Sequence, residues 1–468
     1  MASESMASSS RTAQPISRII VDETSTHGPT ANTSSRPEVS GSSRTLIAGA
    51  STAGTSARYP RPSFSIDSAH YGRFIQKFRS HSLFVPAVAA AISAIAWSGH
   101  ILTIPFALLA PVLLYHTQSR AHSYTTLFCY YLGASWPLIP GANTFFGARG
   151  KMVEGVLICL GASALLGIPA ALLFTRSRTV HPFAIGAMFL LTALPPLGII
   201  GWASPLLSAG VLFPGTAWLG LIGTLALLPL SARFPMWTVT IVVLASLATN
   251  CLYKPPAPPA DWEAINTQFG GAGQGDPDFL SEFLSSERIQ ATIAQSNAQV
   301  LLFPEHVVTR WTEATEAFWH DSLDNLAARH ATLVIGVGLP RARRSSPSAG
   351  HAYYNAVLAR GKGTTTVYYQ RIPVPIAMWD PFSTDGVPLN LFGPGTIVVA
   401  KQHVAVLICY EQLLVWPFLS SAAENPTVLI TTANDYWAKG TPIPKIQEAS
   451  TESWARLFRL PVLSAMNL

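Results

Sequence analysis

The chain has 468 residues, of which 49% are hydrophobic and only 12% are charged, and its mean hydropathy is +0.32. This composition is too apolar for an ordinary water-soluble protein of two or three domains. The formal net charge is +6, but the Lys and Arg residues are scattered and form no basic helix, which argues against nucleic acid as a partner.

The first segment, residues 1–72, is rich in Ser, Thr, Ala and Pro and has no periodic apolar pattern. Such a segment buries too little apolar surface to offset its ordering entropy, so we expect a disordered tail. It also has no continuous apolar core, which excludes a secretory signal peptide.

Long apolar segments follow, and they predict a transmembrane helical bundle over residues 73–252. Several segments reach the roughly 20 residues that cross a bilayer core. Buried helices of a large soluble protein are the alternative, but such proteins rarely contain so many uncharged segments in series. About seven spans are expected, with an uncertainty of one, near residues 83–98, 100–116, 124–140, 152–174, 181–201, 205–231 and 235–252.

Basic residues predict how this bundle is oriented. Most of them fall on one side of the predicted spans, which by the positive-inside rule is the cytoplasm. With seven spans the C-terminal half then lies in the periplasm of a bacterial inner membrane, whereas an even number would reverse it. The residues on the cytoplasmic side are Arg73, Lys77, Arg79, Arg120, Arg176, Arg178 and Arg233, and the exceptions are Arg149 and Lys151.

A Pro-rich linker, residues 253–263, separates the bundle from a globular domain over residues 264–468. In that domain, strand patterns alternate with helical patterns, which indicates a layered α/β fold. The strand candidates are residues 299–304, 332–338, 353–359, 365–369, 403–409 and 427–432. The helical candidates are residues 277–298, 311–329, 411–423 and 445–458.

Two of these strands end on residues that suit covalent chemistry. Cys409 follows the apolar run 403–408 and precedes Glu411, and Glu305 follows the run 299–304. A thiol and a carboxylate on separate strand ends suggest acyl transfer through a nucleophilic cysteine. Taken alone, Cys409 would more often be a buried structural thiol and Glu305 a solvated carboxylate.

The other three cysteines, Cys129, Cys159 and Cys251, lie in or beside apolar segments and fit a packing role. No disulfide framework and no zinc spacing is present. We therefore expect neither a metal nor a cofactor.

Five motifs in the C-terminal half resemble the nitrilase, or carbon–nitrogen hydrolase, superfamily over about residues 290–468. They are Phe303-Pro304-Glu305, Tyr353-Tyr354-Asn355-Ala356, Arg371 with Val374-Pro375, Ile408-Cys409-Tyr410-Glu411 and Asn434-Asp435-Tyr436-Trp437. With the apolar half added, the layout resembles apolipoprotein N-acyltransferase and the TraB conjugal-transfer proteins. The resemblance implies an α-β-β-α sandwich and a role in plasmid conjugal transfer. It also implies a C-terminally short domain whose sheet edge would be completed by a partner chain, left exposed or shielded by the bilayer.

The resemblance assigns roles to several residues. Cys409 would form a thioester, Glu305 would be the general base, and Glu411 would orient groups or relay protons. The remaining motif residues would shape the substrate pocket, namely Tyr410, Asn434, Asp435 and Trp437. A membrane lipid or lipoprotein would be the acyl donor, and conjugation or envelope proteins would be partners.

One family residue, a lysine that supports the oxyanion, has no counterpart here. Gln370 or Tyr369 stands in its place, and the carboxylate expected after the Val-Pro element is also missing, at Ala377 and Met378. Loss of one oxyanion donor typically lowers the rate by about 10²–10³.

Several interpretations remain open. The protein could be an altered enzyme in which Gln370 or Arg371 is the electrophilic partner, although strand alternation directs Arg371 to the opposite face. It could be rescued by Lys362, or be an anchored amidase for small soluble substrates. Finally, it could be a catalytically inactive membrane scaffold that assists mating-pair or envelope assembly.

Overall fold

The computed structural model describes residues 17–21, 83–145, 152–270, 279–341, 352–382 and 386–468. Within the predicted disordered tail, only the strand β1 (Ser17–Val21) is described, and it pairs in parallel with β2 (Trp262–Gln268). The rest of the tail lies outside the described residues, as do the basic residues Arg73, Lys77, Arg79, Arg149 and Lys151.

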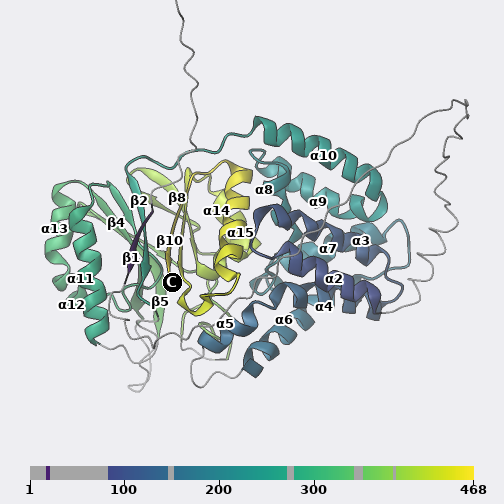
Figure 1. The fold of residues 1–468 in the computed structure, drawn as a ribbon, viewed down its shortest axis with the longest axis horizontal. Coiled ribbons are helices and arrows are strands. Elements are labelled where there is room, and N and C mark those ends of the chain that lie inside the picture. Colours follow the sequence, from purple (N-terminus) through teal and green to yellow (C-terminus); the bar gives the residue numbers. More distant parts are fainter. Residues whose placement is uncertain (1–16, 22–82, 146–151, 271–278, 342–351, 383–385) are drawn as a thin grey trace, which may run out of the picture. The chain divides into compact units, whose positions relative to one another are not determined.

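The first half of the described chain is helical (Figure 1). Its longer helices are α2 (Phe84–Ala96), α4 (Arg120–Ser135), α6 (Met152–Leu173), α7 (His181–Ala193), α9 (Trp218–Arg233) and α10 (Pro235–Leu252). Shorter elements connect them, namely η1 (Ile101–Leu108), α3 (Leu109–Tyr115), α5 (Leu138–Phe145), η3 (Leu197–Ile199), η4 (Pro205–Leu207) and α8 (Ser208–Leu212).

Among the described residues, only α6 and α10 are long and apolar enough to cross a membrane. The prediction of about seven full-length spans is therefore not confirmed. Helix breakers explain two of the shortfalls. The segment at 181–201 leaves the helix at Leu194, which is extended before Pro195. The segment at 205–231 is interrupted by Pro214 and by Gly215, whose φ is 78°.

The second half contains a mixed sheet with the strand order β6-β5-β4-β3-β2-β10-β9-β8-β7. Its strands after β2 are β3 (Val300–Leu302), β4 (Thr332–Pro340), β5 (Tyr353–Gly361), β6 (Thr364–Tyr369), β7 (Thr396–Val399), β8 (Gln402–Ile408), β9 (Val428–Asn434) and β10 (Val462–Asn467). The helices between them are α11 (Phe279–Gln295), α12 (Glu313–Phe318), α13 (His320–Ala328), η5 (Cys409–Leu413), α14 (Val415–Ala423), η6 (Tyr436–Ala438) and α15 (Ile443–Phe458).

Alternation along the strands divides the domain into four layers. Val300 and Val334 on β3 and β4 join one inner cluster with Val404 and Val406 on β8, so the two halves of the sheet face each other. The intervening side chains of β3 and β4 pack on α11 and α13, and those of β8 and β9 pack on α14 and α15 (Figure 1). The order of layers is therefore helix, sheet, sheet, helix.

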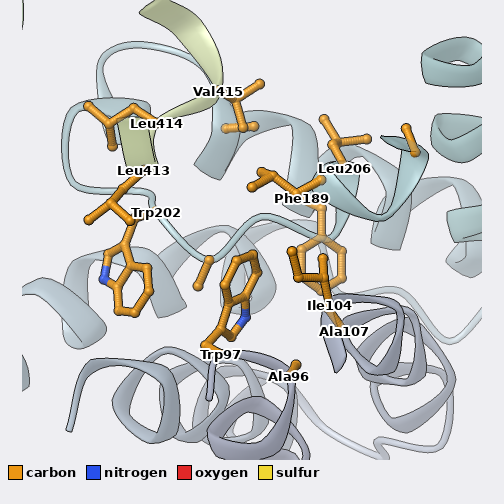
Figure 2. Packing of buried hydrophobic residues seen from close by; sticks show 14 of the residues in the cluster. Ala96, Trp97, Ile104, Ala107, Phe189, Trp202, Leu206, Leu413, Leu414 and Val415 are labelled. Atoms are coloured by element: carbon orange, nitrogen blue, oxygen red, sulfur yellow. The ribbon is translucent and has the colours of Figure 1, made fainter. Parts of the chain in front are cut away.

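The outer face of α14 and α15 shares a core with the helical half. Leu413, Leu414 and Val415, which follow Cys409, belong to the same buried cluster as Trp97 and Trp202 (Figure 2). On α15, the Ser453 hydroxyl donates a hydrogen bond to the backbone carbonyl of Leu207. The segment after the cysteine is thus packed directly against the apolar helices.

Every predicted strand is present, and four further strands were missed, among them β1, which lies in the predicted disordered tail. β2 was assigned in part to the linker, β7 is only four residues long, and no strand was predicted at residues 462–467, which form β10. The incomplete sheet edge that was expected at the end of the domain is not found there, because β10 lies inside the sheet between β2 and β9. Helix 311–329 is two helices, α12 and α13, and helix 411–423 is η5 followed by α14.

Candidate active site

The topology brings four strand ends together. β3, β8 and β9 are linked through parallel pairings, and β6 runs parallel to β4 because β5 is antiparallel to both. The residues that follow these strands therefore lie at one end of the sheet. They are Glu305, Cys409, Asp435 and Gln370, and all four are buried.

Cys409 sits in a sharp turn between β8 and η5. Its φ is +48°, a left-handed value that few non-glycine residues adopt. Backbone strain of this kind persists only where the surroundings enforce it, and it is concentrated at functional sites. The turn places the thiol just beyond the C-terminal end of β8 rather than within the sheet.

Glu305 lies beside this thiol and is held at both carboxylate oxygens. Its Oε1 accepts a hydrogen bond of 2.6 Å from Asn355 Nδ2, and its Oε2 accepts one of 2.9 Å from the Asn434 backbone N–H. The Cys409 thiol lies close enough to this carboxyl group for each to shift the pKa of the other. Burial raises the pKa of Glu305 to about 7, against the lowering effect of these hydrogen bonds.

The thiol itself is not pre-ionised. Burial, with the neighbouring carboxyl groups of Glu305 and Asp435, raises the pKa of Cys409 well above its usual range. Burial and the charge of Glu305 likewise raise the pKa of Asp435 to about 8. At neutral pH the site therefore holds a neutral thiol beside a carboxylate that is poised to accept its proton.

Gln370, not Tyr369, is directed toward the groups around Glu305 and Cys409. Its side-chain Oε1 accepts from Asn355 Nδ2 at 2.9 Å and its Nε2 donates to the Ile408 carbonyl at 3.3 Å. Tyr369 is 44% exposed on the other face of the strand. Lys362 is exposed in the turn between β5 and β6, at the opposite end of β6 from Gln370, so it supplies no cation to the site.

Arg371 points away from Cys409, as strand alternation predicted. Its guanidinium donates to Ser421 Oγ at 2.8 Å and to the Pro417 carbonyl at 2.9 Å on α14. It also pairs with Glu411, whose Oε1 lies 3.7 Å from Arg371 Nε. The hypothesis that Arg371 replaces the lysine is therefore not supported by its position.

Glu411 supports the backbone around the site. Its Oε1 accepts from the Arg371 N–H at 2.7 Å, and its Oε2 accepts from the Ile408 N–H and the Tyr368 hydroxyl, both at 3.0 Å. All of these donors lie on the side of the turn away from the cavity, which favours the orienting role over a proton relay. We call Tyr368, Arg371 and Glu411 the elbow cluster.

A cavity of about 1280 Å³ opens in front of Cys409. Its lining includes Glu305, Tyr410, Asn434 and Trp437, as well as Gln447, while the far wall is the apolar helix α6 from Leu157 to Leu166. Of the predicted site residues, Gln370, Arg371, Glu411 and Asp435 do not line it. The only Lys or Arg among its described lining residues is the exposed Arg310.

Two curated proteins are similar to the chain over most of its length. It is 31% identical over 402 residues to the conjugal transfer protein TraB of Agrobacterium fabrum (strain C58), covering 81% of this chain and 91% of that protein. It is 30% identical over 391 residues to the probable conjugal transfer protein TraB of Sinorhizobium fredii (strain NBRC 101917), covering 80% of this chain and 95% of that protein. The chain belongs to the TraB family.

No family model matches this TraB-family chain. Among solved structures, a carbon-nitrogen hydrolase from Helicobacter pylori G27 is 13% identical, with a TM-score of 0.29 over 40% of this chain and 67% of that one. An amidase of the nitrilase superfamily from Nesterenkonia is 12% identical, with a TM-score of 0.29 over 40% of this chain and 71% of that one.

Two residues of the site were missed by sequence reasoning. Asn355 holds both Glu305 and Gln370, and it could have been found because it lies in one of the five motifs. Gln447 on α15 places its Nε2 3.9 Å from Cys409 Sγ. No sequence signal marks Gln447, since a glutamine in an amphipathic helix is ordinarily a solvated residue.

Proposed function

We propose that this protein is a membrane-bound acyltransferase or carbon–nitrogen hydrolase of plasmid conjugal transfer, which acts through a thioester on Cys409. The observation that carries the proposal is the cavity, because it joins a buried thiol–carboxylate pair to the apolar helix α6. The five nitrilase-type motifs, which are far apart in the sequence, also meet around this cavity.

The chemistry follows from the protonation states. Cys409 Sγ attacks the carbonyl carbon of the donor, the carbon–sulfur bond forms, and Glu305 takes the thiol proton. Glu305 then returns this proton to the leaving group, which departs and leaves a thioester. An amine or water attacks the thioester carbon, and the carbon–sulfur bond breaks. Glu305 takes a proton from the attacking group and returns it to Cys409 Sγ, which regenerates the thiol.

A long acyl chain suits the far wall of the cavity. That wall consists of Leu157, Ile158, Leu165 and Leu166 with the small residues between them, and it offers apolar contact rather than hydrogen bonds. α6 is also one of the two helices in the described part of the chain that are long and apolar enough to span a bilayer. We infer that the donor is a membrane lipid or lipoprotein, that the protein is a multi-pass inner-membrane protein, and that its α/β domain is periplasmic.

Mating assays test the role of the thiol. Cys409→Ala should abolish plasmid transfer from a donor strain that lacks the wild-type gene, while the protein still accumulates in the membrane. Cys251→Ala is the matched control, because Cys251 is exposed on α10 and does not line the cavity. Undiminished transfer with Cys409→Ala would refute the catalytic function.

The chain-length preference tests the cavity. Gly161 on α6 lines the cavity and has no atom within 4 Å of where a Cβ would stand, so Gly161→Phe should fill the far end and favour shorter acyl donors. Gly223 on α9 has the same open space but lies outside the cavity, which makes Gly223→Phe the control. Equal effects of the two variants on donors tagged at the acyl chain would contradict an acyl site along α6.

A specific observation favours the second candidate, an inactive scaffold for mating-pair or envelope assembly. No Lys or Arg of the described residues faces the thiol from the lysine position, which Gln370 fills. Under this alternative, Cys409→Ala leaves plasmid transfer intact, whereas variants that unfold the domain abolish it.

A further inference from the structure

The side chains of Asp435 and Gln447 meet beside the nucleophile. Both are buried, with exposures of 0% and 1%. The Gln447 amide bridges two groups: its Nε2 lies 3.9 Å from Cys409 Sγ, and its other end lies 2.5 Å from Asp435 Oδ2 and 3.3 Å from Oδ1. Among the described residues, Gln447 is the one side chain that hydrogen-bonds the Asp435 carboxyl group.

The 2.5 Å contact between Gln447 and Asp435 Oδ2 fits two protonation states of Asp435, each with its own orientation of the amide. If Asp435 is ionised, the amide must turn so that its NH₂ donates to the carboxylate, and the amide oxygen then faces the sulfur. If Asp435 is protonated, its hydroxyl donates to the amide oxygen at a length typical of O–H···O bonds. The amide NH₂ then faces Cys409 Sγ, as the 3.9 Å contact has it.

We propose that Gln447 is the hydrogen-bond donor at the reacting sulfur, and that Asp435 is the positioning residue whose proton decides whether that donor faces Cys409. The donor would stabilise the negative charge that Cys409 Sγ carries once Glu305 has taken its proton, in a cavity whose described lining includes no lysine. Gln370 is less suited to it, because it does not line the cavity and its amide is bonded to Asn355 and to the Ile408 carbonyl.

The titratable groups that face Asp435 and Gln447 follow two other strands. Glu305 after β3 and Cys409 after β8 face Asp435 after β9, and both carboxyl groups act on the thiol. His306, half-buried next to Glu305, also lines the cavity. Because burial and Glu305 raise the pKa of Asp435 to about 8, the amide presents its donor at neutral pH and withdraws it in more alkaline solution.

The test is the alkylation rate of Cys409 by iodoacetamide as a function of pH, read by peptide mass spectrometry on the full-length protein in detergent. The wild type should gain reactivity with pH and then show a break near the titration of Asp435. Asp435→Asn keeps an amide donor toward the Gln447 oxygen at every pH, so the break should vanish. Gln447→Met, of similar length, should slow alkylation about tenfold at neutral pH and much less above the break.

The exposed Cys251 is alkylated in the same samples and is the internal control. A wild-type profile with no break, or a break that survives Asp435→Asn, would overturn the proposal, as would equal slowing by Gln447→Met at all pH values. The wild-type profile needs no variant, so poor folding of either variant leaves the proposal open to refutation. The proposal rests on the proposed reaction at Cys409, but iodoacetamide needs no natural donor, so failure to find an acyl adduct remains a separate result.

Discussion

Two buried polar clusters flank the turn at Cys409, and they differ in how their charges are compensated. The elbow cluster pairs the Glu411 carboxylate with a guanidinium and with backbone N–H groups, and it does not line the cavity. The cavity cluster, which comprises Glu305, Cys409, Asp435 and Gln447, holds two carboxyl groups beside a thiol with no Lys or Arg among the described residues that contact them. The compensated charge of the elbow cluster supports the fold, whereas in the cavity cluster burial without a cation raises the pKa values of Glu305 and Asp435 toward neutral pH, as catalysis requires.

The largest expected effect is on the reaction itself. Glu305→Gln keeps the size of the side chain and one of its two acceptor oxygens but removes the base, so the rate of Cys409 acylation should fall by about 10²–10⁴. The rate is measured with an acyl donor in detergent micelles. Acylation that proceeds at the wild-type rate would mean that the cavity cluster does not act through its carboxylate.

The next effect concerns stability. Arg371→Met leaves the buried Glu411 carboxylate without its cation, so the free energy of unfolding should fall by about 3–5 kcal/mol. Arg360→Met is the control, because Arg360 pairs with Glu316 at the surface, where such pairs contribute about 0–1 kcal/mol. Denaturant unfolding of both variants measures the difference, and equal losses would show that the elbow cluster is not special.

The cavity cluster should behave in the opposite way. Because burial raises the folded-state pKa of Glu305 from 4.5 to about 7, the folded protein binds more protons than the unfolded chain between these pH values. Stability from this group is therefore lost as pH rises from about 4.5 to about 7. Glu305→Gln removes the penalty and should raise the free energy of unfolding at pH 8 by roughly 2–4 kcal/mol.

The same variant should stabilise little at pH 4, where Glu305 is already protonated in both states. A Glu305→Gln protein that is less stable than the wild type at pH 8 would contradict the idea that this cluster trades stability for reactivity. Together with Arg371→Met, this measurement compares how two buried charged groups of one site change the free energy of unfolding.

The smallest effect restores a cation to the site. Asn355 Nδ2 bridges Glu305 and Gln370, so a lysine at position 370 would lie near the base. Gln370→Lys should therefore lower the pH midpoint of acylation by roughly one unit, since a nearby cation lowers a carboxyl pKa. Gln370→Met, neutral and of similar length, should leave the midpoint in place. An identical midpoint in all three proteins would show that the side chain at position 370 does not affect the pKa of Glu305.

Sequence alone predicted much of the α/β domain because its strands are apolar runs that end on distinctive residues. It placed Glu305 and Cys409 at the ends of two separate strands, and the alternation argument correctly turned Arg371 away. It could not choose between Tyr369 and Gln370, because that choice depends on which face of β6 meets β8. Gln447 was missed because its partners lie on other elements, and β10 was missed because its place depends on long-range pairing.

The helical half was harder to predict for a different reason. Mean hydropathy reports that a segment is apolar, but it does not report where the helix breaks. Pro195 and the Pro214-Gly215 pair divide two of the expected spans, and one α8 residue, Gly210, packs against the Ser453 backbone with no room for a Cβ. Contacts of that kind depend on the α/β domain and cannot be predicted from the apolar pattern of the helical half.

The central claim is that Cys409 carries an acyl group, and intact-protein mass spectrometry of the protein extracted from membranes tests it most directly. The wild type should carry an adduct that hydroxylamine removes, Cys251→Ala should carry it too, and Cys409→Ala should not. The mass of the adduct would identify the acyl chain. Absence of any adduct on the wild type, together with a Cys409 thiol that resists alkylation at neutral pH, would contradict the claim and favour the scaffold.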